Sequence, residues 1–408
     1  MRIALIVAAF SLAGCTTVAG AEPATPAAVV VAFDGGTITP LIVEGLADRD
    51  SGRAVEANDP VRIASVSKLV MALATLRLVD EGKVDLDADI SAYLGWEVRH
   101  PDYPEARVTL EQLLTHRSGL RDDAGYVIPL GESLQAKLAE PEAWYRGAPP
   151  GEAPFEYANL GSPVVATVLE AATGERYDRL VERTVFAPLG IEACLNWIGC
   201  SDDFAERAVV LYRSTGEVAR DDAGDRPPNC TIPVAEGIAC SLDGYVPGTN
   251  ASIFSPQGGV RIGMMDLAKI GQAIYLEDGR LLSPETGELL RASIRDRIHL
   301  ARDADSGPEF FCVYGLGAQL IELPIPRCDD KLFDDGRPRL GHAGEAYGLR
   351  SGLWFATGEF AQGIAYFTSA VPDRTAPDEG GFAPEEIALV RRAMEKLAAS
   401  DELAASPD

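Results

Sequence analysis

Strand-like patterns lie near the two ends of this 408-residue chain and are missing from its middle. Apolar runs at residues 28–34 and 38–43 flank Gly35-Gly36, a pair typical of a β-hairpin turn. Further strand patterns occur at residues 314–323, 339–343, 352–355 and 362–367. Between about residues 85 and 257 there is no strand pattern of any length. We therefore expect one mixed domain of helices and strands built from both termini, with a mostly helical domain inserted.

Helical periodicity marks the segments between and after these strands. The first helical segment follows Ser65 and ends near Gly82, where a C-terminal cap is expected. Its apolar residues recur at helical spacing: Leu69, Val70, Leu73, Leu76 and Val79. Similar patterns occur at residues 163–172, 264–275 and 384–398. We expect a mixed part at about 29–84 and 256–400, a helical part at about 85–255, and a tail at 401–408.

The composition is that of a globular protein and excludes disordered and collagen-like chains, with 47% hydrophobic and 24% charged residues. Acidic residues outnumber basic ones by 62 to 36, which gives a formal net charge of −26. Such a surface repels phosphate backbones, so no nucleic-acid partner is expected. Because like charge keeps domains dispersed, we expect a monomer.

Residues 1–14 have the pattern of an export signal. Arg2 supplies a positive charge, and the apolar run that follows is too short for a permanent membrane-spanning helix. Leu12-Ala13-Gly14-Cys15 resembles the lipobox of bacterial lipoproteins, in which the cysteine becomes the lipidated N-terminus. Cleavage after Ala19-Gly20-Ala21 is the alternative.

Lipidation of Cys15 would attach the exported protein to a membrane through a tether at residues 15–28. Residue 16 is Thr rather than Asp. For a Gram-negative cell, the lipoprotein resemblance then implies the periplasmic face of the outer membrane.

Six further cysteines agree with export: Cys194, Cys200, Cys230, Cys240, Cys312 and Cys328. Short loops close most readily, so we predict the neighbour pairs Cys194–Cys200, Cys230–Cys240 and Cys312–Cys328. A metal site is the alternative. It is disfavoured because the chain has no Cys-x-x-Cys pair and only four scattered histidines. No metal and no other cofactor is expected.

Ser65-Val66-Ser67-Lys68 opens the first helical segment. Lys68 falls one turn after Ser65 on the same face, and helical side chains lean toward the N-terminus, so the amine points back at the Ser65 hydroxyl. A desolvated lysine can take a serine proton, and a helix N-terminus offers N–H groups to an oxyanion. Taken alone, the motif fits a helix-capping Ser65 and a solvated Lys68 better.

Two more triplets change this interpretation. Tyr157-Ala158-Asn159 lies in a loop before a helical segment, and His342-Ala343-Gly344 lies on a predicted strand. In this order and at wide spacing, Ser-x-x-Lys, Tyr-x-Asn and Lys/His-x-Gly resemble the three motifs of penicillin-recognising serine enzymes. The chain is identified as a member of the class C β-lactamase and D,D-peptidase-like superfamily, which also holds esterases and D-aminopeptidases. The resemblance covers about residues 30–371.

This resemblance implies a β-lactamase/transpeptidase-like α+β fold, with an antiparallel sheet flanked by helices. It also implies that Ser65 is the acylated nucleophile, Lys68 its proton acceptor and Tyr157 a proton shuttle to the leaving group. Which of Lys68 and Tyr157 is the resting base stays open. Asn159 would hold Lys68 and the substrate. The backbone N–H groups of Ser65 and Glu345 would form the oxyanion hole.

The third motif has His342 where many β-lactamases have lysine. A histidine near its reference pKa of about 6.5 is mostly neutral at pH 7 and anchors a substrate carboxylate less strongly. If His342 is such an anchor, affinity for acidic substrates should rise below about pH 6. Arg350 could supply the charge instead, although a solvated surface arginine is the simpler expectation. Gly344 would let the substrate approach the strand closely.

We therefore expect an exported serine hydrolase that acts through a Ser65 acyl-enzyme on small esters or amides, such as D-amino-acid peptides. A β-lactamase or D,D-carboxypeptidase is one alternative. A penicillin-binding or sensor protein that turns over slowly is another. Because Ser65, Lys68, Tyr157 and Asn159 are all present, catalysis is favoured over a non-catalytic relative.

Overall fold

The computed structural model describes residues 26–225, 227–295, 310–333, 335–356, 362–372 and 381–405. The expected signal, Cys15 and most of the expected tether lie outside these residues. Within the described residues, no helix is both long enough and apolar enough to cross a membrane.

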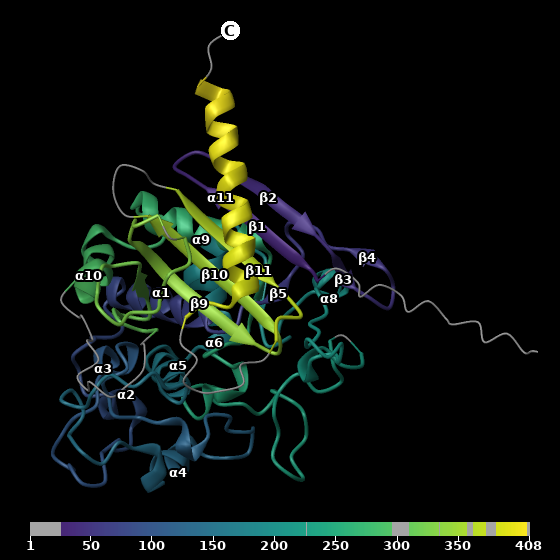
Figure 1. Ribbon diagram of the computed structural model, residues 1–408. Helices are drawn as coiled ribbons and strands as arrows, with labels where there is room; N and C mark the ends of the chain where they lie inside the picture. The colour runs from purple at the N-terminus through teal and green to yellow at the C-terminus, as the bar shows by residue number, and fades with distance from the viewer. Residues whose placement is uncertain are drawn as a thin grey trace, which may run out of the picture.

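A six-stranded antiparallel sheet forms the centre of the molecule, in the order β2-β1-β11-β10-β9-β8 (Figure 1). Two of its strands come from the N-terminal part and four from the C-terminal part: β1 (Ala28–Phe33), β2 (Ile38–Glu44), β8 (Gln319–Ile321), β9 (Arg339–Ala346), β10 (Leu349–Ala356) and β11 (Gly363–Thr368). β1 pairs with β11, which joins the two ends of the chain in one sheet. The expected α+β fold built from both termini is therefore confirmed.

Helices cover both faces of this sheet (Figure 1). α1 (Val66–Asp80) and α9 (Met264–Leu276) pack on one face, and α11 (Pro384–Ala405) packs on the other. In β1, Val29 and Val31 enter the core with α1 and α9, while Val30 and Ala32 enter the core with α11. Because both faces are buried, this strand is a continuous apolar run.

Helices provide nearly all of the regular secondary structure in the middle of the chain, although turns and loops make up most of its described residues. Its α-helices are α2 (Ser91–Leu94), α3 (Leu110–Leu114), α4 (Leu134–Leu138), α5 (Gly161–Thr173), α6 (Tyr177–Val181), α7 (Ala187–Leu189) and α8 (Asp202–Arg207). Short 3-10 helices lie at Asp122–Ala124, Pro141–Ala143, Arg220–Asp222 and Ala251–Phe254, and a short π-helix lies at Glu182–Phe186. One strand of this region, β6 (Ala193–Leu195), pairs with β7 (Val260–Ile262) and thereby joins a small sheet with β5 (Val61–Arg62). A second small sheet pairs β3 (Leu46–Asp48) with β4 (Arg53–Ala54). These strands have only two or three residues each, too few to show a pattern.

The C-terminal part of the structure differs from the sequence analysis in three ways. The strand expected at 314–323 is only β8, because the N–H of Gly315 bonds to Ala318 and Gly317 has a φ of +64°, which makes a turn. Helix α10 (Pro284–Arg295) was not predicted. Helix α11 continues to Ala405, into the expected tail.

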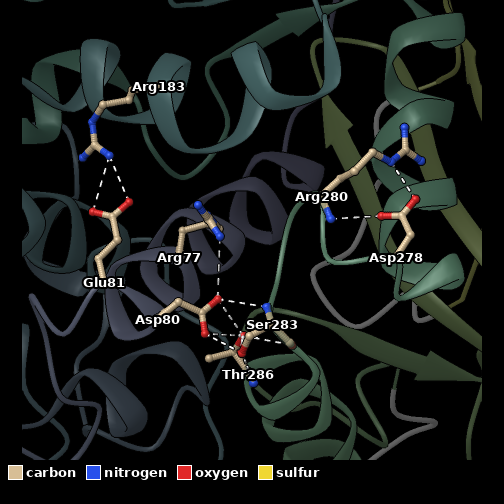
Figure 2. Close-up of polar contacts among 8 residues, drawn as sticks. All are labelled: Arg77, Asp80, Glu81, Arg183, Asp278, Arg280, Ser283 and Thr286. Atoms are coloured by element: carbon tan, nitrogen blue, oxygen red, sulfur yellow. Dashed lines mark hydrogen bonds and ion pairs between the residues drawn. The ribbon is translucent and has the colours of Figure 1, made fainter.

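The C-terminal end of α1 is fixed by side-chain contacts (Figure 2). The Asp80 carboxylate accepts from the N–H and hydroxyl of Ser283, at 3.0 and 2.6 Å, and from the Thr286 hydroxyl at 3.0 Å. This joins α1 to the start of α10. Glu81 pairs with Arg183 at 3.0 Å, which joins the same end to the neighbouring helical segment. The opposite end of α1 carries Ser65.

The six described cysteines pair as sequence neighbours: Cys194–Cys200, Cys230–Cys240 and Cys312–Cys328. These are the pairs that the loop-length argument predicts. The third disulfide ties the segment before β8 to the loop after it.

Candidate active site

Ser65 lies at the N-terminal end of α1 and lines a cleft of about 880 Å³. The chain turns sharply just before it, because Ala64 has a φ of +46°, a conformation that few residues other than glycine adopt. Two hydrogen bonds tie this turn to β7: Ile63 donates to the carbonyl of Val260 at 3.0 Å, and Ser67 Oγ accepts from the N–H of Val260 at 3.1 Å. Ser65 is thus held at a fixed position in the cleft.

Lys68 lies one turn after Ser65 and is only 1% exposed. Its Nζ lies 3.4 Å from Ser65 Oγ, 2.7 Å from Asn159 Oδ1 and 3.3 Å from the Gln257 carbonyl. Burial lowers the pKa of Lys68 to about 7, an effect that the nearby negative Asp122 opposes. An amine with this pKa is unprotonated in a large share of molecules at pH 7 and can accept the Ser65 proton. The structure excludes the solvated lysine.

Tyr157 completes this group. Lys68 Nζ lies 4.6 Å from the centre of its ring. Burial raises the pKa of Tyr157 well above that of a free phenol, and the adjacent Ser65 hydroxyl offsets this only in part. The phenol hydroxyl is buried and does not reach hydrogen-bonding geometry with any described group. A tyrosine in this state keeps its proton at neutral pH, so the geometry favours Lys68 as the resting base and Tyr157 as a proton donor.

His116 holds the loop that carries Tyr157. Its Nδ1 accepts from the N–H of Ala158 at 3.2 Å, and its ring centre lies 4.6 Å from that of Tyr157. His116 has a φ of +54°, which bends the chain so that the imidazole faces this loop. These contacts give His116 a structural role beside the active site.

Asp122 is a site residue that the sequence analysis missed. Its carboxylate accepts from the N–H of Asn159 at 2.7 Å, from Asn159 Nδ2 at 2.8 Å and from the N–H of Leu160 at 2.9 Å. These bonds orient the Asn159 amide so that its oxygen faces Lys68. Asp122 carries no motif of its own, and nothing in the sequence separates it from the other acidic residues.

The edge of β9 forms the wall opposite the loop of Tyr157. β8 pairs only with residues 339–341, so within the described strands the rest of this edge of β9 has no partner. Ala343, Gly344 and Glu345 line the cleft there, together with Ser65. A Cβ on Gly344 would lie 2.4 Å from the Ile63 carbonyl and 2.3 Å from Ser351 Oγ. The protein's own packing therefore requires this glycine, a reason different from the expected approach of a substrate.

The expectation that His342 anchors a carboxylate needs correction. The side chain is buried beneath the cleft wall, and Nδ1 donates to the Ala343 carbonyl at 2.6 Å, while Nε2 accepts from the Tyr314 hydroxyl at 3.0 Å. Burial lowers the pKa of His342 to about 3, with a further contribution from Lys68. A neutral ring with both nitrogens bonded inside the protein offers no charge to a substrate.

Arg350 is also placed differently from the solvated arginine expected. It is 3% exposed, lines the cleft, and pairs with Glu345 at 2.9 Å. A second cleft arginine, Arg62, pairs with Asp221 at 2.6 Å. Both guanidinium charges are therefore balanced by carboxylates beside the site.

The sequence matches the Beta-lactamase family over residues 13–383. The chain belongs to the beta-lactamase family. It is 35% identical to Esterase EstB of Burkholderia gladioli over 186 residues, which are 41% of this chain and 46% of that protein. It is 24% identical to Penicillin-binding protein 4 of Amycolatopsis lactamdurans over 67% of each chain. The aligned stretch thus spans less than half the length of the esterase.

Solved structures of other proteins share this fold. D-amino acid amidase from Ochrobactrum anthropi SV3, complexed with D-phenylalanine, superposes with a TM-score of 0.63 at 20% identity. The superposition covers 92% of this chain and 95% of the amidase. The family match and these relatives support a serine hydrolase with a β-lactamase/transpeptidase-like fold.

Within this family frame, the structure brings together four of the residues predicted from the motifs: Ser65, Lys68, Tyr157 and Asn159. Gly344 and Glu345 face them across the cleft, and His342 lies beneath. The arrangement can generate a serine nucleophile, protonate a leaving group and present backbone N–H groups to an oxyanion.

Proposed function

We propose that this protein is an exported serine hydrolase that cleaves small esters or amides through an acyl-enzyme on Ser65. One observation supports this above all others. The buried Lys68 amine, with a pKa of about 7, is within reach of Ser65 Oγ and is oriented by Asn159. A helix-capping serine beside a solvated lysine would have neither feature.

The reaction begins when Lys68 takes the Ser65 hydroxyl proton as Oγ attacks the substrate carbonyl carbon. The carbonyl electron pair moves onto oxygen, where the N–H groups of Ser65 and Glu345 stabilise the negative charge. Tyr157 donates its proton to the leaving alcohol or amine as the scissile bond breaks, and it recovers a proton from Lys68. Water then attacks the acyl carbon by the reverse sequence and regenerates Ser65 with the free acid.

Neutral esters and amides fit the charges of this cleft better than substrates bound by a carboxylate. Arg62 and Arg350 are each paired with an acidic side chain, and His342 is neutral. Arg220 also lines the cleft, but it is exposed, so water and salt screen its charge. A β-lactamase or D,D-carboxypeptidase therefore stands second. Membrane attachment through lipidated Cys15 at the periplasmic face is part of the same proposal, on the basis of the N-terminal sequence.

Hydrolysis of p-nitrophenyl acetate by wild type, Ser65→Ala and Ser255→Ala tests the proposal. Ser255 also lines the cleft, but the described partner of its hydroxyl is Gln257 Nε2 rather than a lysine, so its variant should keep activity within about threefold of wild type. Ser65→Ala should lose at least about 1,000-fold in kcat. Unchanged turnover in Ser65→Ala would refute the assignment. A stable wild-type adduct without turnover would favour the sensor alternative.

A further inference from the structure

Aromatic side chains crowd one end of the cleft, directly beside Tyr157. The Phe311 ring stacks on the Tyr157 ring, with centres 4.2 Å apart and an angle of 7° between the planes. Phe310 meets Phe311 edge-on at 4.9 Å and meets Phe382 edge-on at 5.0 Å. We call Phe310, Phe311 and Phe382 the aromatic wall.

The aromatic wall is fixed to the main sheet. Cys312, directly after Phe311, is buried and forms the disulfide with Cys328. The buried Gln319 on β8 donates from Nε2 to the Phe310 carbonyl at 3.0 Å. Because these bonds hold the backbone on both sides of Phe311, the two rings are pre-organised before any ligand arrives.

Phe310 and Phe311 are nevertheless only half-buried, and both line the cleft. Partly exposed rings on a fixed backbone gain contact area and lose hydrated apolar surface when an apolar group covers them. Glu386, the carboxylate beside the wall, accepts from the buried Tyr366 hydroxyl at 2.6 Å. Its other oxygen accepts from the N–H of Ala383 at 3.3 Å, so both oxygens have partners within the protein.

We propose that the aromatic wall binds an apolar group of aromatic size on the substrate. The proposal rests on the function proposed above, since the wall adjoins Tyr157 and faces the same cleft as Ser65. Phe310 and Phe311 are the specificity-determining residues. The apolar group can belong to the acyl part or to the leaving alcohol, and the shared chemistry is contact with the rings.

Two series of esters distinguish these sources. The first holds p-nitrophenol constant and compares the acetate with the phenylacetate. The second holds the acetyl group constant and compares ethyl acetate with benzyl acetate, whose leaving alcohols are of similar basicity. Each kcat/KM ratio is measured for wild type, Phe310→Ala and Phe310→Leu. Phe333→Ala is the control, because Phe333 is another half-buried phenylalanine but lies outside the cleft lining.

Wild type should prefer the aromatic member of at least one series. Phe310→Ala should reduce that preference by about three- to tenfold, the range for one aromatic contact. The preference of Phe310→Leu should lie between those of wild type and Phe310→Ala, and the preference of Phe333→Ala should match that of wild type. Equal kcat/KM ratios in wild type and both Phe310 variants would overturn the proposed role of the aromatic wall. Ser65-dependent acetate hydrolysis would still support the proposed function in that case. If wild type hydrolyses none of these esters, the proposed function is refuted, and this inference is refuted with it.

Discussion

Lys68 lies in an environment very different from water. Its amine is buried among Ser65, Asn159 and the Gln257 carbonyl, so the charged form is disfavoured. The motif alone places the Lys68 amine near the Ser65 hydroxyl but does not show whether the amine is buried from solvent. That property comes from the packing of α1 beneath the sheet, which no local pattern records.

The first prediction concerns pH. Because the pKa of Lys68 is lowered to about 7, the unprotonated base is lost as pH falls through this value. We expect kcat/KM for a neutral ester to be level above about pH 8 and to fall by about tenfold per unit below about pH 6. Initial rates between pH 5 and 9 check this. A level profile over the whole range would argue against Lys68 as the base.

Asp122 provides a second prediction. Asp122→Asn removes the charge that raises the pKa of Lys68 and replaces an acceptor of three hydrogen bonds. We expect kcat to fall by about 10- to 100-fold and the acidic limb of the pH profile to move to lower pH. Asp123→Asn is the control, because that side chain is exposed. A fall in kcat without a shift of the limb would indicate only a structural role.

His342 shows how burial changes a motif residue. From sequence it is expected near its ordinary pKa, as a weak anchor for carboxylates. In the structure, burial and the nearby Lys68 lower the pKa of His342 to about 3 and keep it neutral. The affinity for acidic substrates should therefore not rise as the pH falls from about 8 to 5 on account of this residue, contrary to the expectation from sequence.

At the scale of elements, most of the long segments were predictable, with α10 (Pro284–Arg295) as the exception, and the shortest were not. Helices α1, α5 and α9 and strands β1, β2 and β11 follow from apolar spacing. β5, β6 and β7 have two or three residues each, and only tertiary pairing makes them strands. Asp122 lies in one of these short elements, the helix Asp122–Ala124, which is why the site was predicted without it.

Glu170 on α5 carries the prediction at this scale. Its carboxyl is buried and accepts from the N–H groups of Tyr177 and Gly248, at 2.8 and 2.9 Å, and from the Tyr245 hydroxyl at 2.6 Å. Glu170→Ala leaves these donors without partners, so the free energy of unfolding should fall by about 2 to 4 kcal/mol. Chemical denaturation measures this change.

The pH dependence of this change gives a sharper test. Burial raises the pKa of Glu170 from its ordinary 4.5 to about 7, so the folded protein retains a proton that the unfolded chain releases between these values. The stabilisation by Glu170 is full below the lower value and decreases as pH rises through the higher one. The loss in Glu170→Ala should be larger at pH 5 than at pH 8. Glu175→Ala, which removes a partly exposed ion pair with Arg183, should change the free energy by less than about 1 kcal/mol.

At the scale of the whole molecule, the order of the motifs predicted the fold through the family resemblance, and the structure places these motifs on α1, the loop before α5 and β9. The sheet that joins the two ends brings them to one cleft. The order of the motifs does not predict which other residues line that cleft. The stacking of Phe311 on Tyr157 and the pairing of Arg62 and Arg350 with carboxylates come from tertiary packing, which the motifs do not record.

The proposed membrane attachment concerns the whole chain and gives a further prediction. In a Gram-negative host, wild type should sediment with membranes, and Cys15→Ser should appear in the soluble fraction. The mass of the mature N-terminus distinguishes the alternatives, since cleavage before Cys15 and cleavage after Ala21 leave different chains. A soluble wild-type protein that begins at Glu22 would rule out the lipid anchor.

The central claim is that Ser65 becomes covalently acylated, and rapid quenching with acid followed by peptide mass spectrometry tests it most directly. During turnover of p-nitrophenyl acetate, we predict an acetyl group on the peptide that contains Ser65, which chases away when the ester is exhausted. The same peptide from Ser65→Ala should remain unmodified. An acetyl group on another residue that is kinetically competent for turnover, or turnover with no adduct and no need for Ser65, would contradict the account.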